Sequence, residues 1–340
     1  MIYTILKHLI NKQNIKFNNC YKIIKAIIFG KIKSTQISSI LTALAIKKET
    51  SEEIAATAKV INDYYNYNMT NDNVMDLVGT GSDSVNYFNI STTASLVVAA
   101  AGSINVAKYG SKSISSHSGS LDLLNALGVN LKLKKKDIIK CITKLRLVFL
   151  KSEFKYKKKI RKLRMDLKIP TIFNIIGPLT NPIHPLKQLV GVYDKRLLNV
   201  LSKVFMKLGS NTTLIIHSKE GSDEISLKNS TYISELNNGK IKNYLINPNN
   251  FGIKNKTLDL IKIKNVLQSL DIIINSIQGN LGIAFEIIIL NSGTALYVSG
   301  VVNNIKNGIE LAKYILISGK AYEKLKTIVY FTKCLNKGIF

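Results

Sequence analysis

From Val74 onward, short apolar runs alternate with stretches of helical periodicity, and this alternation constrains the fold more than any other feature. The run VMDLV (74–78) precedes a glycine-rich loop, and INVAK (104–108) follows a helix of small residues. Further on, LVGVY (189–193) and TTLIIHS (212–218) flank another helical stretch. Such alternation indicates βαβ units, whose strands run parallel. We therefore predict an α/β fold with a mostly parallel central sheet flanked by helices.

The beginning of the chain has a different pattern. Residues 1–68 show helical periodicity and no strand-turn signals. Ser51, followed by Glu52 and Glu53, predicts the capped start of one helix. The polar run YNYNMTNDN (65–73) then predicts a linker. We expect a small all-α domain in front of the α/β region.

The formal net charge of +27 raises the question of nucleic-acid binding. Only four of the 48 basic residues are Arg, although Arg has the better geometry for phosphates and bases. Lys, Ile and Asn all have A/T-rich codons, so a biased genome accounts for the charge. The composition therefore disfavours nucleic-acid binding as the main role.

The sequence also disfavours a membrane-spanning protein, a secreted protein and a protein stabilised by disulfides or zinc. The most apolar stretch, residues 283–302, is interrupted by Glu286, Asn291 and Ser292, whereas a spanning helix needs about 20 mostly apolar residues. The N-terminal segment lacks the basic region and cleavage site of a signal peptide. Three scattered cysteines are too few for a disulfide framework or a zinc site. We expect a cytoplasmic protein without a membrane partner.

The segment DLVGTGSDSVNYFNIST (76–92) has the features of a phosphate-binding loop. Gly79 and Gly81 allow backbone N–H groups to approach an anion closely, and Ser91 and Thr92 fall where a helix begins. A helix N-terminus offers free N–H donors and the positive end of a dipole. The spacing is neither a Walker A loop nor GxGxxG, so a tight turn with a capping residue remains the alternative.

A second polar loop, AKYGSKSISSHSGSLD (107–122), follows the next strand. Its hydroxyl and amide donors suit a polyphosphate, with Lys108 as a point charge. The alternative is a solvated, serine-rich surface loop. Because ligands of α/β sheets gather at the carboxyl ends of strands, the two loops together favour a phosphate site.

The adjacent acids Asp223 and Glu224 follow the strand TTLIIHS in a chain with only 21 acidic residues. Mg²⁺ in proteins is often bound by one or two carboxylates together with phosphate oxygens. The pair therefore suits Mg²⁺ opposite a phosphate loop, and a solvated acidic turn is the alternative. The segment 161–182 predicts a helix carrying Arg164, then a buried run and a turn, with no chemistry of its own.

In this order and spacing, these segments resemble the anthranilate phosphoribosyltransferase family. The sharpest matches are DLVGTGSD, FNIST, SGSLDLLNALG, TIFNIIGPLTNP and the acidic pair. The resemblance extends to about residue 330, and the run GPLTNP separates the chain from the related pyrimidine nucleoside phosphorylases. It implies transfer of the 5-phosphoribosyl group of phosphoribosyl pyrophosphate (PRPP) to the amine of anthranilate. The products are N-(5-phosphoribosyl)anthranilate and pyrophosphate, in the biosynthesis of tryptophan.

The resemblance also implies an architecture and partners. A small helical domain would span residues 1–70, joined by part of the region 165–190. It would be hinged to an α/β domain over residues 71–340. The family uses Mg²⁺ and forms homodimers, which we expect through the helical domain.

The site residues implied by the resemblance fall in a few segments. For PRPP they are Gly79, Ser82, Asp83, Tyr87, Asn89, Ile90, Ser91, Thr92, Lys108, Tyr109, Gly110, Ser111, Lys112, Ser113, Ile114, Ser115, Ser116 and Ser120. For anthranilate they are Gly79, Ser111 and Arg164, with Arg164 facing the carboxylate, and for Mg²⁺ they are Ser91, Asp223 and Glu224. No dedicated nucleophile or base is expected, because displacement at C1 of the ribose needs no covalent enzyme intermediate.

The chain departs from the family pattern at several of these positions. Ser82 replaces the last glycine of GTGGD. In the segment that is usually KHGNR, Tyr109, Ser111 and Lys112 replace His, Asn and Arg, and Pro170 replaces the Arg of RT. The changes fall more on the acceptor side than on the PRPP side. Two alternatives follow: a pyrimidine nucleoside phosphorylase-like enzyme, or a decayed homologue that binds phosphate-rich ligands or nucleic acid without catalysis.

Overall fold

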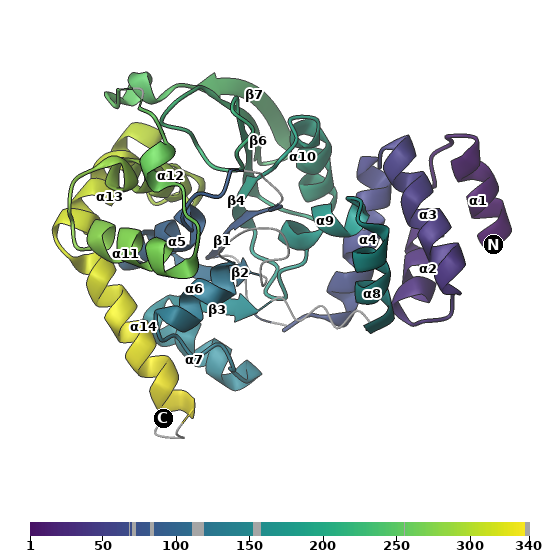
Figure 1. Ribbon diagram of the computed structural model, residues 1–340, viewed down its shortest axis with the longest axis horizontal. Helices are drawn as coiled ribbons and strands as arrows, with labels where there is room; N and C mark the ends of the chain where they lie inside the picture. Colours follow the sequence, from purple (N-terminus) through teal and green to yellow (C-terminus); the bar gives the residue numbers. More distant parts are fainter. Residues whose placement is uncertain are drawn as a thin grey trace.

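A computed structural model provides the fold. It describes residues 1–67, 69, 73–81, 85–110, 119–151, 158–254 and 256–336. Within these ranges, a group of helices comes first and a seven-stranded sheet covered by helices follows (Figure 1). The predicted α/β class with a leading all-α part is confirmed. No helix in the described ranges is long and apolar enough to cross a membrane.

The first four helices pack through apolar stripes. They are α1 (Ile2–Ile10), α2 (Phe17–Ile28), α3 (Ser34–Lys47) and α4 (Ser51–Tyr64). In α2, the buried side chains include Ile23, Ile24 and Ile27, at the three- and four-residue spacing of one helix face.

Helix α4 begins with a capping box one residue earlier than predicted. The Thr50 hydroxyl accepts the Glu53 backbone N–H at 3.3 Å, and the Glu53 carboxylate accepts the Thr50 N–H at 2.8 Å. The predicted cap at Ser51 is wrong because this reciprocal pairing requires the cap to lie three residues before the glutamate.

The sheet runs in the order β3-β2-β1-β4-β5-β6-β7. Its strands are β1 (Val74–Gly79), β2 (Asn105–Gly110), β3 (Leu147–Lys151), β4 (Lys187–Gly191), β5 (Thr212–Ser218), β6 (Thr231–Asn237) and β7 (Lys240–Ile246). Strands β1 to β5 pair in parallel, and β6 and β7 add an antiparallel edge. The mostly parallel sheet is therefore confirmed.

Strand β3 was not predicted from the sequence pattern. The helix before it ends at Arg146, which adopts a left-handed conformation with φ 56°. Glycine usually occupies this position, so the stop signal that separates helix from strand is missing. The apolar run of β3 consequently resembles a continuation of the helix.

Helices cover both faces of the sheet. They are α5 (Ile90–Ala100), α6 (Ser120–Ala126), α7 (Lys135–Leu145), α8 (Lys158–Leu167), α9 (Ile172–Ile175), α10 (Leu197–Lys207), α11 (Val266–Ile277), α12 (Ile283–Val298), α13 (Ile305–Ile317) and α14 (Lys320–Asn336). Short 3₁₀ turns lie at η1 (Gly177–Leu179), η2 (Pro248–Phe251) and η3 (Asp259–Ile261).

The hydrophobic core has two parts, one on each face of the sheet. Because successive strand residues point to opposite faces, Leu214 and Ile216 enter the part that contains α5 and α12. Ile215 enters the other part, with α10 and the N-terminal helices. That second part also contains Leu163 of α8 and Phe173 of α9, so these helices share a core with the N-terminal helices (Figure 1).

Candidate active site

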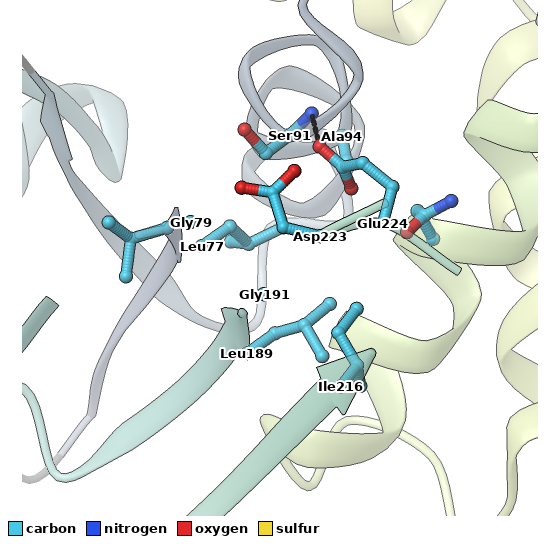
Figure 2. Close-up of a pocket in the computed structure, with 11 residues that line it drawn as sticks. Leu77, Gly79, Ser91, Ala94, Leu189, Gly191, Ile216, Asp223 and Glu224 are labelled. Carbon is cyan, nitrogen blue, oxygen red and sulfur yellow. Dashed lines mark hydrogen bonds between the residues drawn. The ribbon is translucent and has the colours of Figure 1, made fainter. Parts of the chain in front are cut away.

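Two glycines at strand ends make room for the acidic pair. Gly79 ends β1 and Gly191 ends β4, and the two are partners in the parallel ladder. A Cβ atom on Gly79 would lie 2.2 Å from Asp223 Oδ2, and one on Gly191 would lie 1.7 Å from the Asp223 carbonyl oxygen. Figure 2 shows Asp223 above these strand ends. This is the edge of a parallel sheet at which ligands gather.

The second acid of the pair meets the start of α5. A Glu224 carboxylate oxygen accepts the backbone N–H of Ser91 at 3.1 Å (Figure 2). Ser91 lies in the first turn of α5, where N–H groups lack helical partners and the dipole is positive. Gly79, Ser91, Asp223 and Glu224 thus line one pocket at the strand ends. The structure therefore brings the predicted glycine loop, helix start and acidic pair together.

Lys108 lies behind this pocket, within strand β2, as the strand run 104–108 predicts. Its side chain is only 4% exposed, and its ammonium donates to the Leu77 carbonyl at 2.6 Å and to the Ser91 hydroxyl at 3.1 Å. Burial lowers the pKa of Lys108, while the nearby carboxylates of Asp76, Glu224 and Asp223 oppose this shift. The predicted point charge is thus a buried cation that reaches the site through Ser91.

A buried network beneath the site connects β1 and β2 to the run TIFNIIGPLTNP. Asp76 accepts the Tyr109 backbone N–H at 3.1 Å and the Asn181 amide at 2.9 Å, and the same amide donates to the Ala107 carbonyl at 2.8 Å. Burial raises the pKa of Asp76 to about 6, against the opposing effects of Lys108 and these donors. Asn181 therefore gives the run a structural role that the sequence did not reveal.

The predicted PRPP residues differ in whether their side chains are available to a ligand. The hydroxyl of Thr92 is buried and has no hydrogen-bond partner among the described residues. A buried polar group without a partner is costly, so this hydroxyl suits a ligand. In contrast, the side chains of Tyr109 and Ile90 lie in the core, 6% and 1% exposed. Their side chains contribute to packing, and their backbone N–H groups bind Asp76 and the Phe88 carbonyl.

Four of the remaining predicted positions, Asn89, Gly110, Ser120 and Tyr87, fall within the described residues. Asn89 accepts a hydrogen bond from the Ser269 hydroxyl at 2.9 Å. Gly110 ends β2 close to Ser120, whose hydroxyl would lie 2.4 Å from a Cβ atom on Gly110. Tyr87 forms an isolated bridge with Lys262. The positions Ser82, Asp83, Ser111, Lys112, Ser113, Ile114, Ser115 and Ser116 fall outside the described residues.

Arg164 is placed apart from the acidic pair, on α8. Its guanidinium donates to the Asn174 side chain at 3.4 Å and lies 5.9 Å from the centre of the Phe173 ring. Asn174 also accepts the Thr171 backbone N–H at 3.0 Å, which fixes the start of α9. Arg164 does not belong to the lining of the pocket around Asp223.

The oxygen atoms of the pocket suit a hard divalent cation. Ser91, Asp223 and Glu224 offer a hydroxyl and two carboxylates, which are ligand types that Mg²⁺ prefers. Among the described residues, no group of three or more His, Cys, Asp or Glu side chains could hold a metal alone. The protein thus supplies part of a coordination sphere, and the rest would come from water and from phosphate oxygens.

Two residues of this pocket were missed at the sequence level. Gly191 falls inside the strand run LVGVY, and an interior strand glycine can signal a close backbone approach. Asn291 interrupts an apolar helix and lines the same pocket. Both signals are present in the sequence, but neither shows which distant segment is the partner.

Comparison with known proteins gives matches over nearly the whole chain. The glycosyl transferase family, a/b domain, matches residues 71–322, and the glycosyl transferase family, helical bundle domain, matches residues 3–64. Anthranilate phosphoribosyltransferase of Vesicomyosocius okutanii subsp. Calyptogena okutanii (strain HA) is 44% identical over 332 residues, covering 95% of this chain and 96% of the relative. The enzyme of Burkholderia cenocepacia (strain HI2424) is 37% identical over 332 residues, covering 96% of each.

Solved structures show the same fold. The crystal structure of anthranilate phosphoribosyltransferase from Thermus thermophilus has a TM-score of 0.89 and 29% identity, covering 97% of this chain and 99% of that one. The Saccharomyces cerevisiae enzyme in complex with PRPP and Mg has a TM-score of 0.86 and 25% identity, covering 98% of each chain.

Proposed function

The chain belongs to the anthranilate phosphoribosyltransferase family, and on this premise we propose that it transfers the 5-phosphoribosyl group of PRPP to the amine of anthranilate. The observation that carries the proposal is the acidic pair, which faces the start of α5 across Gly79. Two carboxylates beside the positive end of a helix dipole suit a polyphosphate that arrives with a divalent cation.

We infer that the PRPP diphosphate lies between Gly79 and the first turn of α5. The unpartnered Thr92 hydroxyl, in the first turn of α5, is available to it. The Lys108 cation acts through the Ser91 hydroxyl, which it orients by donating to it. Fixed dipoles of this kind stabilise the negative charge that grows on a leaving pyrophosphate. The predicted positions in the segments 82–83 and 111–116 rest on sequence resemblance.

Asp223, Glu224 and Ser91 are the residues that would hold Mg²⁺. When bound, Mg²⁺ neutralises charge on the diphosphate and thereby improves the leaving group. The chain's own contribution is to orient the two carboxylates. The Ser91 N–H holds the Glu224 carboxylate by a hydrogen bond. Gly79 and Gly191 have no Cβ atoms, and this leaves the space that Asp223 occupies.

The reaction forms a bond between C1 of the ribose and the anthranilate nitrogen, and breaks the bond from C1 to the pyrophosphate oxygen, with inversion. The anthranilate amine is unprotonated at neutral pH, and its proton leaves to solvent as the product forms. No enzymatic base is required for this step, so the protein contributes chiefly by positioning the reactants.

Stoichiometry tests the reaction class. Purified protein with PRPP, anthranilate and Mg²⁺ should release one pyrophosphate per anthranilate consumed, and chelation of Mg²⁺ should abolish the release. Cleavage of uridine by inorganic phosphate, without turnover of anthranilate, would instead identify the nucleoside phosphorylase activity.

Arg164→Ala should raise the KM for anthranilate by about 30-fold or more and change the KM for PRPP little. We assign the Arg164 guanidinium to the anthranilate carboxylate, and loss of one partner of a charged hydrogen bond costs about 2–5 kcal/mol. Steady-state kinetics with each substrate varied in turn measures the split. Arg161→Ala, on the exposed side of α8, is the matched control. An equal rise in both KM values would remove this assignment.

We also propose a homodimer formed through the helical domain of residues 1–70, which part of the region 165–190 would complete. Large apolar side chains of that part are exposed, including Tyr3 at 78%, Ile10 at 75% and Ile46 at 68%. Exposed apolar groups of this size favour burial against a partner. Light scattering should give twice the chain mass of 37.8 kDa, and a mass of one chain at micromolar concentration would contradict the dimer.

A further inference from the structure

Helix α12 contains a buried amide in an otherwise apolar setting. Most residues of α12 are buried, and Asn291, in the middle of the helix, is 1% exposed. Burial of an amide is costly unless its donors and acceptor find partners. The partners of Asn291 therefore indicate why a polar residue is kept at this position.

Asn291 binds both backbone polar groups of Ile225. Its side-chain oxygen accepts the Ile225 N–H at 3.0 Å, and its amide donates to the Ile225 carbonyl at 3.1 Å and to the Ile287 carbonyl at 2.9 Å. These bonds use both amide hydrogens, so no side-chain donor remains for a ligand. Ile225 directly follows Glu224, and its own side chain is buried in the core. Asn291 thus fixes the backbone on one side of the acidic pair.

The other side of the pair is fixed by short-range bonds. The Ser218 hydroxyl accepts the Ser222 N–H at 2.9 Å, and the Ser222 hydroxyl accepts the Glu224 N–H at 3.2 Å. These bonds connect the turn to Ser218, the last residue of β5, but not to α12. The connection to α12 is made by Asn291.

We propose that Asn291 is a positioning residue, which sets where the Asp223 and Glu224 carboxylates enter the pocket. It acts on the divalent cation and the diphosphate of PRPP through the acidic pair. The inference rests on the proposed function, since it concerns the same pocket. Loss of a residue that orients metal ligands typically lowers metal affinity or activity by about 10–100-fold.

The test compares Asn291→Leu with Ser292→Ala. Leucine has a similar volume and removes every bond of the amide. Ser292 is the next residue of α12, is fully buried, and its hydroxyl has no hydrogen-bond partner among the described residues. Asn291→Leu should raise the half-saturating Mg²⁺ concentration and the KM for PRPP by about tenfold or more. The KM for anthranilate should stay within about twofold, and Ser292→Ala should leave all three values near wild type.

Calorimetric titration with Mg²⁺ and inorganic pyrophosphate gives a readout that needs no turnover. Asn291→Leu should weaken this binding by about tenfold or more, and Ser292→Ala should not. If the wild-type protein binds Mg²⁺ and pyrophosphate but consumes no anthranilate, the proposed function is refuted. The effect of Asn291→Leu on this binding can still be measured in that case. Unchanged binding in Asn291→Leu, or an equal loss of affinity for PRPP and anthranilate, would overturn the inference.

Hydrogen exchange in the wild-type protein covers the case in which Asn291→Leu does not fold. If Asn291 holds the turn in place without ligand, the Ile225 amide should exchange as slowly as amides of β5. Exchange of this amide at the rate of an open loop would overturn the inference.

Discussion

Replacing Asp223 with Asn and Glu224 with Gln together should lower kcat/KM for PRPP by about 10³-fold or more. The two amides keep the shape of the carboxylates but remove both negative charges from the pocket at the strand ends. They therefore remove the charged ligands for Mg²⁺, while the Ser91 N–H can still find an acceptor at position 224. Steady-state kinetics at several Mg²⁺ concentrations measures the effect.

The Mg²⁺ dependence of the activity distinguishes a loss of Mg²⁺ ligands from a general loss of the folded structure. Raising Mg²⁺ should restore only part of the lost activity, because the cation would still bind through the diphosphate. Asp259→Asn is the control, since Asp259 is exposed and interacts with Lys262 and Thr257 away from the pocket. Wild-type kinetics and Mg²⁺ dependence in the double variant would remove the metal assignment.

Gly191→Ala should cost about 100-fold or more in kcat/KM for PRPP. A Cβ atom there would lie 1.7 Å from the Asp223 carbonyl oxygen and 2.8 Å from the Asp223 Cβ, so the backbone of the acidic turn must move. A misplacement of about 1 Å can cost about 10²-fold in rate. Overpacking should also lower the free energy of unfolding by about 1–3 kcal/mol. Kinetics and urea unfolding of the same preparation measure both effects.

Gly282→Ala provides the matched control for this substitution. A Cβ atom on Gly282 meets nothing within 4 Å, and the backbone there is extended. This variant should retain the kinetics of the wild-type protein. A Gly191→Ala protein that is destabilised but fully active would show that Asp223 does not need its present position.

Most of the architecture could be predicted from the sequence because local patterns specify it. The parallel strands of residues 74–78, 189–193 and 212–218 were recognised from short apolar runs between turns and helices, and they form β1, β4 and β5. Strand β3 was missed because a left-handed Arg146, not a glycine, ends the preceding helix. Errors of this kind arise where the backbone conformation is decided by tertiary packing.

The candidate site could be predicted only in its local parts. The glycine loop, the start of α5 and the acidic pair each carry a recognisable pattern. The connections between them depend on contacts that no local pattern encodes. Asn291 binds Ile225 across 66 positions of sequence, and Asn181 binds Asp76 across 105. Such pairings become visible only when the fold has brought the segments together.

The acceptor side also illustrates this limit. Sequence comparison places Tyr109 where the family has a histidine, which suggests a changed substrate contact. The structure buries the Tyr109 side chain and uses its backbone N–H to bind Asp76. At this position the structure therefore has a core side chain of strand β2.

The most direct test follows anthranilate fluorescence in a mixture of purified protein, PRPP, Mg²⁺ and anthranilate. If the chain is a working transferase, the fluorescence should fall only when both PRPP and Mg²⁺ are present. Such a fall would establish the donor, the acceptor and the reaction together. Constant fluorescence, from protein that binds PRPP by calorimetry, would contradict the proposed transfer.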